Sequence, residues 1–403
     1  MKISDIIKKT WDGEIVTIDK SEFKSLNLNK NKLKLDEEGI VVKEDENNYI
    51  FYRFDNKNRP SIDIKSYDHK YEMPEFTDEV ICILKNALNG KSSNILLTGV
   101  AGTGKSEFIR EVCKIAGYGK IFQVNGRDDM DSSDFFGEKT VVIDPISKQN
   151  HIKFIKGSLY QAFIEGTEVD EEGNQILYNE KGERVYDDSG NPKVIGKPGV
   201  FFLDEFAAIL PSVFLSVFNR AMEIPRKQGE SRTIEISSDA GKVVKSHPGF
   251  MMFLAGNTVG KGTENDCMMG YTAQNNLMDD STLDRISAVY SFGYNIDAER
   301  NIAMKKLNDD YDVHCLMKFI KEIRRQWTNG NVETLFSTRT LVQVCDLARI
   351  FREIKEDYLT LAIYRCIFSS LREHEISAWN ETARLIFDKD ILYCHRNDKM
   401  FFV

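Results

Sequence analysis

Short apolar runs alternate with amphipathic segments between about residue 75 and residue 293. Five runs rich in Val, Ile, Leu and Phe predict strands, at 95–98, 120–124, 200–203, 250–255 and 289–292. Strands that are apolar throughout are typical of a parallel sheet covered on both faces. A segment with helical spacing precedes them at 77–88, and others lie between them, including 105–116 and 211–222. The pattern therefore predicts an α/β fold, a three-layer αβα sandwich, over residues 76–295.

The two flanks of this region have other patterns. Residues 1–75 contain alternating runs such as EIVTIDKSEF and NNYIFYRFD, so we predict a small β-rich module there. Its role is open. After residue 295 the spacing is helical throughout, in the segments 297–307, 314–327, 337–351, 357–371 and 375–387. Residues 296–403 are therefore predicted to form a small all-α domain.

Two insertions interrupt the α/β pattern. Residues 165–197 combine turn signals with short strand-like runs and an excess of acidic side chains, which predicts exposed hairpins. Residues 231–247, SRTIEISSDAGKVVKSH, predict one hairpin that turns at 238–242.

Composition narrows the function. The 403 residues include 63 acidic and 54 basic ones, a net charge of -9, which disfavours a surface built to wrap nucleic acid. No apolar run reaches the roughly 18 residues of a membrane span, and the N-terminus lacks a secretory pattern. The seven cysteines are odd in number and never spaced C-x-x-C. We expect a cytoplasmic protein with reduced, buried thiols.

The first predicted strand leads into a glycine-rich turn, GVAGTGKS, which fits the P-loop pattern G-x-x-x-x-G-K-[ST]. Glycines let the main chain approach a nucleotide's phosphates, and the following helix points its positive end at them. The Lys105 ammonium would reach the β- and γ-phosphates, and the Ser106 hydroxyl would bind Mg²⁺. The predicted nucleotide-binding residues are Gly99, Val100, Ala101, Gly102, Thr103, Gly104, Lys105, Ser106 and Glu107.

A pair of carboxylates ends the third predicted strand, in GVFFLDEF at 199–206. After a P-loop, Asp204 is expected to hold Mg²⁺ and Glu205 to orient the water that attacks the γ-phosphate. Solubilising charge is the alternative for such a pair.

These motifs together resemble an AAA+ ATPase. The segment FMMFLAGNTVGKGTENDCMMGYTAQNNLMDDSTLDRISAVYSFGY is similar to the MoxR-like group, and most similar to the small ATPase subunit of cobalt chelatases and the NirQ/CbbQ activators. FFGEKTVVIDP and FIKGSLYQAF resemble the same group. The resemblance covers roughly residues 75–350 and leaves out residues 1–75 and the acidic insertion. It implies ATP as the nucleotide.

The resemblance also implies roles for three further residues. Asn257, in AGNT, matches the sensor residue that helps to position the attacking water. Arg285, in LDRIS, matches the arginine finger that reaches a neighbouring subunit's nucleotide, although Ile286 replaces the usual aromatic residue after it. Arg339, in FSTRTL, matches the second sensor, at the start of a lid helix capped by Ser337 or Thr338.

A finger supplied by a neighbour requires a ring, and the resemblance implies a hexamer. We expect a remodelling ATPase that acts on a protein partner, often one with a von Willebrand A domain in this group. The acidic insertion is a candidate partner surface or a solvated loop. Phe135 and Phe136 are either pore-loop residues or core anchors. A nucleic-acid motor or defence-complex NTPase, and a chelatase motor subunit, are the alternative functions.

Overall fold

The computed structural model of the chain describes residues 16–20, 40–44, 48–53, 62–63, 73–143, 150–186, 190–257 and 280–392. These residues belong to two compact units. One unit takes the described parts of 1–69, 78–96 and 110–289, and the other takes those of 70–77, 97–109 and 290–403. The expected domain limits at residues 75 and 295 remain predictions.

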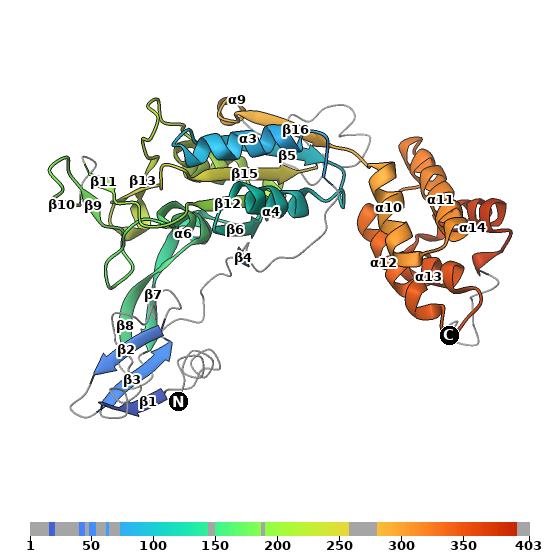
Figure 1. The fold of residues 1–403 in the computed structure, drawn as a ribbon, viewed down its shortest axis with the longest axis horizontal. Helices are drawn as coiled ribbons and strands as arrows, with labels where there is room; N and C mark the ends of the chain where they lie inside the picture. The colour runs from blue at the N-terminus through green and yellow to red at the C-terminus, as the bar shows by residue number, and fades with distance from the viewer. Residues whose placement is uncertain are drawn as a thin grey trace. The chain divides into compact units, whose positions relative to one another are not determined.

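A six-stranded sheet forms the α/β region (Figure 1). In spatial order its strands are β16 (Ala288–Phe292), β5 (Asn94–Gly99), β15 (Met251–Gly256), β12 (Gly199–Asp204), β6 (Lys120–Asn125) and β4 (Ile62–Asp63). β12 runs parallel to both β15 and β6, whereas the short β4 is antiparallel to β6. The five strands predicted from the sequence are confirmed. β5, β12 and β15 are buried along almost their whole length, as expected for inner strands, whereas β16 at the edge alternates with exposed residues.

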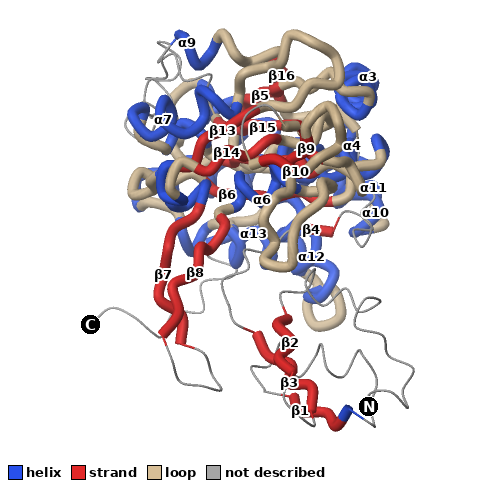
Figure 2. Tube along the Cα trace, turned by 90° about the vertical axis from the view of Figure 1, so that its left-hand side faces the viewer, coloured by secondary structure: helices blue, strands red, loops and turns tan. Residues whose placement is uncertain are grey.

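Amphipathic helices flank the sheet, with α7 on one side and α3 on the other in Figure 2. They are α3 (Thr77–Leu88), α4 (Lys105–Ala116), α6 (Ser158–Ile164) and α7 (Pro211–Ala221), with the short α9 (Asp280–Leu283). In α7 the buried residues Phe214, Val217, Phe218 and Ala221 follow the spacing of one helix face. Pro211 begins the helix, where its fixed φ is favourable. The predicted α/β sandwich is thus confirmed.

Phe135 and Phe136 belong to this core. They end the short helix α5 (Ser132–Phe136), and their exposed fractions are 0% and 8%. The Phe135 ring meets that of Phe218 edge to face, with centroids 4.8 Å apart. The pore-loop alternative is therefore wrong for these two residues, since neither ring is available to grip a chain.

Two hairpins and a set of short strands extend from the α/β core. β7 (Gly137–Ile143) pairs with β8 (Asn150–Lys156), and β13 (Thr233–Ile236) pairs with β14 (Lys242–Lys245). The second hairpin confirms the predicted turn at 238–242. The first was not predicted, because most of its side chains are exposed and no buried face marks it in the sequence.

The acidic insertion contains strands β9 (Leu177–Tyr178), β10 (Arg184–Val185) and β11 (Asn191–Pro192), in the order β10-β9-β11. The expectation of short strands there is confirmed. Near the N-terminus, β1 (Val16–Asp19), β3 (Asn48–Arg53) and β2 (Ile40–Glu44) form an antiparallel sheet in that order, as the alternating pattern predicts.

The C-terminal residues form the predicted helices. They are α10 (Ile296–Leu307), α11 (Asp310–Thr328), α12 (Thr338–Phe351), α13 (Tyr358–Cys366) and α14 (Glu373–Phe387). Their apolar faces enclose a core around Trp379, which is fully buried and stacks on Phe336 at a centroid distance of 6.3 Å. This helical bundle has its own hydrophobic core, separate from that of the sheet.

The described cysteines are free thiols, as expected. Cys113, Cys315 and Cys345 are buried, but Cys82 is exposed on α3, so the expectation of burial is wrong there. None of the described helices is long and apolar enough to span a bilayer.

Glu375 gives a test of the helical bundle. Its carboxylate is fully buried and accepts hydrogen bonds from the main-chain N–H groups of Glu333 (2.7 Å) and Thr334 (2.6 Å). We expect Glu375→Ala to lower the free energy of unfolding by about 1–3 kcal/mol, because both donors lose their partner. Glu373→Ala, in the same turn but exposed, is the control and should change it by less than about 0.5 kcal/mol. Equal urea midpoints for the two variants would contradict this account.

Candidate nucleotide-binding site

The turn between β5 and α4 needs glycine at three positions. Gly99, Gly102 and Gly104 have φ values of 137°, 74° and 91°, a region that residues with a β-carbon rarely adopt. At Gly99 a β-carbon would also lie 2.2 Å from the carbonyl oxygen of Phe292. The glycines therefore let the main chain turn sharply where a buried strand meets a helix.

Lys105, the first residue of α4, carries the charge of this loop. It is only 7% exposed, and its ammonium donates to the carbonyl oxygens of Gly99 (2.6 Å) and Val100 (3.2 Å). The Thr103 hydroxyl also donates to the Val100 carbonyl, at 2.9 Å. A buried ammonium favours an anion, because phosphate oxygens compensate its charge better than carbonyl oxygens do.

A cluster of aromatic rings packs against the first turn of α4, next to the loop. Phe108 of α4 and Phe292 of β16 meet edge to face at 5.3 Å, and the Phe76 ring contacts both. Phe76 also stacks on Tyr290 at 4.9 Å. This packing fixes the first turn of α4, and with it the direction of its positive end.

The start of α12 lies beside the same loop. Of the two predicted caps, Ser337 and Thr338, the structure has Ser337 as the N-cap of α12. Its hydroxyl accepts a hydrogen bond from the Thr340 N–H. A β-carbon at Gly102 would lie 2.8 Å from Cβ of Ser337 and 3.6 Å from Cβ of Arg339. The structure therefore brings Arg339 to the phosphate-binding loop, and its side chain is exposed.

A buried ion pair ties this helix start to the loop. Glu299 of α10 is 1% exposed and binds the guanidinium of Arg324 through two hydrogen bonds of 2.7 Å. It also accepts from the Thr338 hydroxyl. The Arg324 guanidinium lies 3.5 Å from the Tyr294 ring centroid, and the Tyr294 hydroxyl donates to the Ala101 carbonyl at 3.2 Å. These contacts form a continuous path from the P-loop to the helix that carries Arg339.

The acid pair ends β12 in an unusual backbone conformation. Glu205 has φ 51° and ψ 45°, the left-handed region, which is uncommon for residues other than glycine. Strain of this kind is frequent at functional sites. Asn257, after β15, donates from Nδ2 to the Glu205 carboxylate at 3.4 Å, and its buried Oδ1 has no partner in the structure. The structure thus brings Glu205 and Asn257 together. The buried Asn257 Oδ1 beside them is an acceptor that a water molecule would satisfy.

Arg285 follows the short helix α9. Its side chain is half-buried, and its guanidinium donates to the carbonyl of Ser281. The adjacent loop that resembles the MoxR-like group, from 258 to 279, lies outside the described residues.

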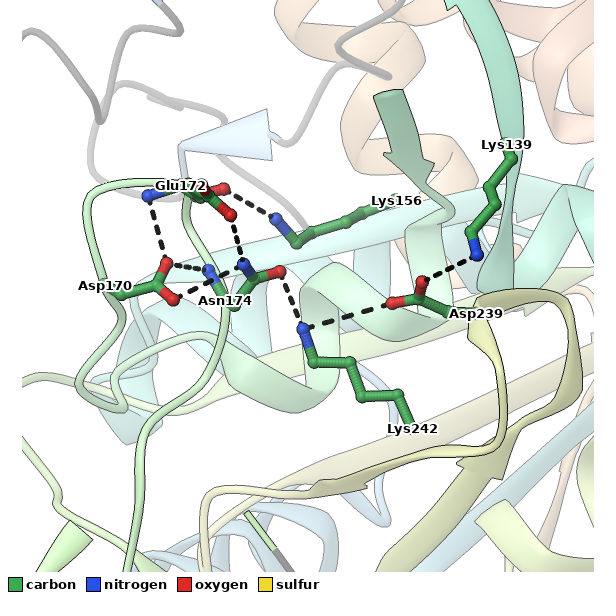
Figure 3. A network of polar contacts seen from close by, with 7 residues as sticks. All are labelled: Lys139, Lys156, Asp170, Glu172, Asn174, Asp239 and Lys242. Atoms are coloured by element: carbon green, nitrogen blue, oxygen red, sulfur yellow. Dashed lines mark hydrogen bonds and ion pairs between the residues drawn. The ribbon is translucent and has the colours of Figure 1, made fainter. Parts of the chain in front are cut away.

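The acidic insertion is anchored to both hairpins (Figure 3). The Asp170 carboxylate accepts from the main chain of Glu172 and Asn174, and so closes a tight loop. Lys242 of β14 donates to Asn174 at 2.7 Å, and Lys156 of β8 donates to the Glu172 carbonyl at 3.3 Å. Burial, followed by repulsion from Lys242, lowers the pKa of Lys156 to about 8. The insertion is therefore a structured element rather than a loose loop.

Comparison with known proteins identifies the central segment. Residues 94–268 match the family described as the AAA domain of the dynein-related subfamily. The chain contains an AAA+ ATPase domain. This match spans the P-loop, the acid pair and Asn257, so the ATP-hydrolysing class predicted from the sequence is confirmed.

Other comparisons add little to the AAA+ domain assignment. A crystal structure of a presumed ATPase from Cytophaga hutchinsonii is similar at 14% identity and a TM-score of 0.34, over 79% of this chain and 89% of that one. No curated protein matches the sequence.

Several residues around the AAA+ site were not predicted, although the sequence held signals for some. Glu299, Ala303 and Leu307 are buried at i, i+4 and i+8, so a charge stands on the apolar face of α10. Arg232 precedes Ile234 and Ile236 in the inward-facing alternation of β13. An ionisable residue on an apolar face indicates a buried polar contact, but the pattern does not name the partner.

Gly102→Ala tests the geometry of the loop. The new methyl group requires an unfavourable φ and meets Ser337, so we expect ATP binding to weaken about tenfold or more, equivalent to 1–2 kcal/mol of strain. Gly182→Ala is the control, because Gly182 has a similar φ of 76° with nothing within 4 Å of the added carbon. Titration with a fluorescent ATP analogue measures both. A loss of affinity for neither variant, or for both alike, would contradict the role of Gly102.

Proposed function

We propose that this chain is a MoxR-like AAA+ ATPase that hydrolyses ATP in a hexameric ring and uses the energy to remodel, assemble or activate a protein partner. The strained Glu205 with Asn257 beside it is the observation that supports hydrolysis beyond mere binding. The sequence resemblance to the MoxR-like group supports the finer assignment.

The P-loop binds the triphosphate in this proposal. Main-chain N–H groups of residues 99–106 and the Lys105 ammonium surround the β- and γ-phosphates. Gly99, Asp204 and Gly256 stand at the C-terminal ends of β5, β12 and β15, and ligands of open α/β sheets bind at such ends.

The oxygen ligands suit a hard cation. The Ser106 hydroxyl and the Asp204 carboxylate are ligands that Mg²⁺ prefers, and bound Mg²⁺ supplies positive charge at the phosphate oxygens. Glu205 accepts a hydrogen bond from the attacking water and orients it. Asn257 holds the Glu205 carboxylate and offers its Oδ1 to the same water.

Two arginines complete the site. Arg285 of one subunit reaches the γ-phosphate bound by its neighbour and stabilises the charge of the transition state. Arg339 binds the nucleotide from the helical bundle, so that turnover moves α12 and, through Thr338 and Glu299, the helices packed on it. A subunit alone is then nearly inactive, and the ring is the active form.

The acidic insertion is the surface that meets the partner. It is held in place by Asn174 and Glu172, and it exposes apolar side chains, including Tyr186 (73%), Ile195 (63%) and Val194 (48%). Exposed apolar side chains favour a protein-binding surface, and the excess of acidic residues in the insertion favours a partner of complementary charge.

Glu205→Gln tests the hydrolytic role. We expect ATP binding to be kept and turnover to fall about 10²–10⁴-fold, because the amide cannot polarise water. The exposed Glu223→Gln is the control and should hydrolyse ATP at the normal rate. A Glu205→Gln protein that turns over ATP at more than about a tenth of the normal rate would contradict the assignment.

Subunit mixing tests the ring. Arg285→Ala and Glu205→Gln subunits should each be inactive, but their equal mixture should regain activity at about a quarter of the junctions, where an intact Glu205 faces an intact Arg285. Light scattering shows whether the mixture forms hexamers. An inactive mixture of assembled rings would show that Arg285 does not act between subunits.

The partner is tested with rings locked by Glu205→Gln and ATP. We expect them to retain a specific protein from cell extract, and Ile195→Ser to weaken its capture without changing ATP hydrolysis in the otherwise normal chain. Hydrolysis that is stimulated instead by DNA or RNA, with a steep dependence on salt, would favour the nucleic-acid alternative.

A further inference from the structure

Arg232 is an arginine placed entirely inside the α/β core. It directly precedes β13 and is 2% exposed. Like Ile234 and Ile236, it is at a buried position of the strand's alternating pattern. Its guanidinium donates to four neutral oxygens, those of Ser92 Oγ (3.3 Å), Asn94 Oδ1 (2.6 Å), Ala221 O (2.8 Å) and Ser93 O (3.1 Å). Burial lowers the pKa of Arg232 to about 9, so it remains protonated at pH 7.

Asn94 extends this network to the finger segment. The first residue of β5 is fully buried, and its Nδ2 donates to the carbonyls of Met222 (2.7 Å) and Arg285 (2.8 Å). Its main chain also exchanges hydrogen bonds with Ser287, to Oγ at 3.1 Å and from N at 2.8 Å. Asn94 therefore fixes the backbone at Arg285 and at the second residue after it.

The end of α7 is held by the same groups. The Arg232 guanidinium donates to the Ala221 carbonyl, while Asn94 Nδ2 donates to that of Met222. Asn219 of α7 accepts from the Thr282 hydroxyl at 3.1 Å, and the Arg285 N–H donates to the Thr282 carbonyl at 3.2 Å. The short segment before Arg285 is thus connected to α7 and to β5 through buried polar groups.

Stability alone is a poor reason for this arrangement. A buried guanidinium bonded to neutral acceptors carries a large desolvation penalty, and an apolar side chain of similar volume often leaves a protein as stable or more stable. The planar guanidinium fixes geometry instead, because its donors hold several acceptors in defined relative positions. Asn94 passes that constraint to the Arg285 carbonyl.

We propose that Arg232 and Asn94 are positioning residues for Arg285, which set the direction in which its side chain leaves the core toward the neighbouring subunit. This inference rests on the proposed role of Arg285 as a finger. A displacement of about 1 Å in a catalytic group lowers the rate by up to about 10²-fold, so a small shift of this backbone has a large effect on turnover.

Subunit mixing separates positioning from general stability. Asn94→Asp keeps the size of the side chain but removes both Nδ2 donors, and its carboxylate repels the two carbonyl oxygens. When Asn94→Asp is added to the Glu205→Gln subunit, which supplies the working finger, we expect the mixture with Arg285→Ala to lose activity about tenfold or more. When it is added instead to the Arg285→Ala subunit, whose finger is already absent, the mixture should keep its activity.

The outcomes are distinct. Equal losses in the two mixtures, or a loss in neither, would overturn the positioning role. If the mixture of Glu205→Gln and Arg285→Ala subunits shows no activity even without Asn94→Asp, the proposed function is overturned instead. Arg232→Met, which fills the site without its donors, is tested in the same two mixtures in case Asn94→Asp does not fold, and its urea midpoint reports folding directly.

Discussion

A buried ammonium at the end of a buried strand is the constraint on which the rest of this structure depends. Lys105 is almost fully enclosed, and its charge lies against the carbonyl oxygens of Gly99 and Val100. Such a charge is costly unless strong acceptors compensate it, and phosphate oxygens are the acceptors that a nucleotide brings. The glycines shape the loop around this charge, the Phe108 and Phe292 rings pack at the first turn of α4, and the helix start at Ser337 lies beside Gly102.

Two networks of polar contacts extend from the P-loop and from the strand before it. In one unit, Tyr294, Arg324 and Glu299 connect the P-loop carbonyl of Ala101 to the helix that carries Arg339. In the other, Asn94 and Arg232 connect the start of the P-loop strand to Arg285. Under the proposed function, these contacts would link Arg339 and Arg285 to the nucleotide-binding region, because hydrogen bonds inside a protein are stronger than in water.

The parts of the fold that can be predicted from sequence are those whose burial leaves a periodic pattern of apolar residues. Strands such as β12 and helices such as α7 follow from hydrophobic spacing, since burial on one or both faces leaves a periodic pattern in the sequence. The P-loop follows from its glycines and lysine, because phosphate binding permits few alternatives. The β7–β8 hairpin is exposed on both faces and leaves no such pattern. Arg232 and Glu299 escaped prediction because a buried ion's partners lie far away in sequence and are fixed only by the tertiary fold.

The most direct test is the affinity of the Lys105→Ala variant for ATP, measured by titration with a fluorescent analogue, beside Lys114→Ala on the exposed side of the same helix. Because the ammonium is the buried charge that phosphate compensates, the account predicts that Lys105→Ala weakens binding about tenfold or more and abolishes turnover, whereas Lys114→Ala binds normally. Normal ATP binding and turnover by Lys105→Ala would contradict the account at its centre.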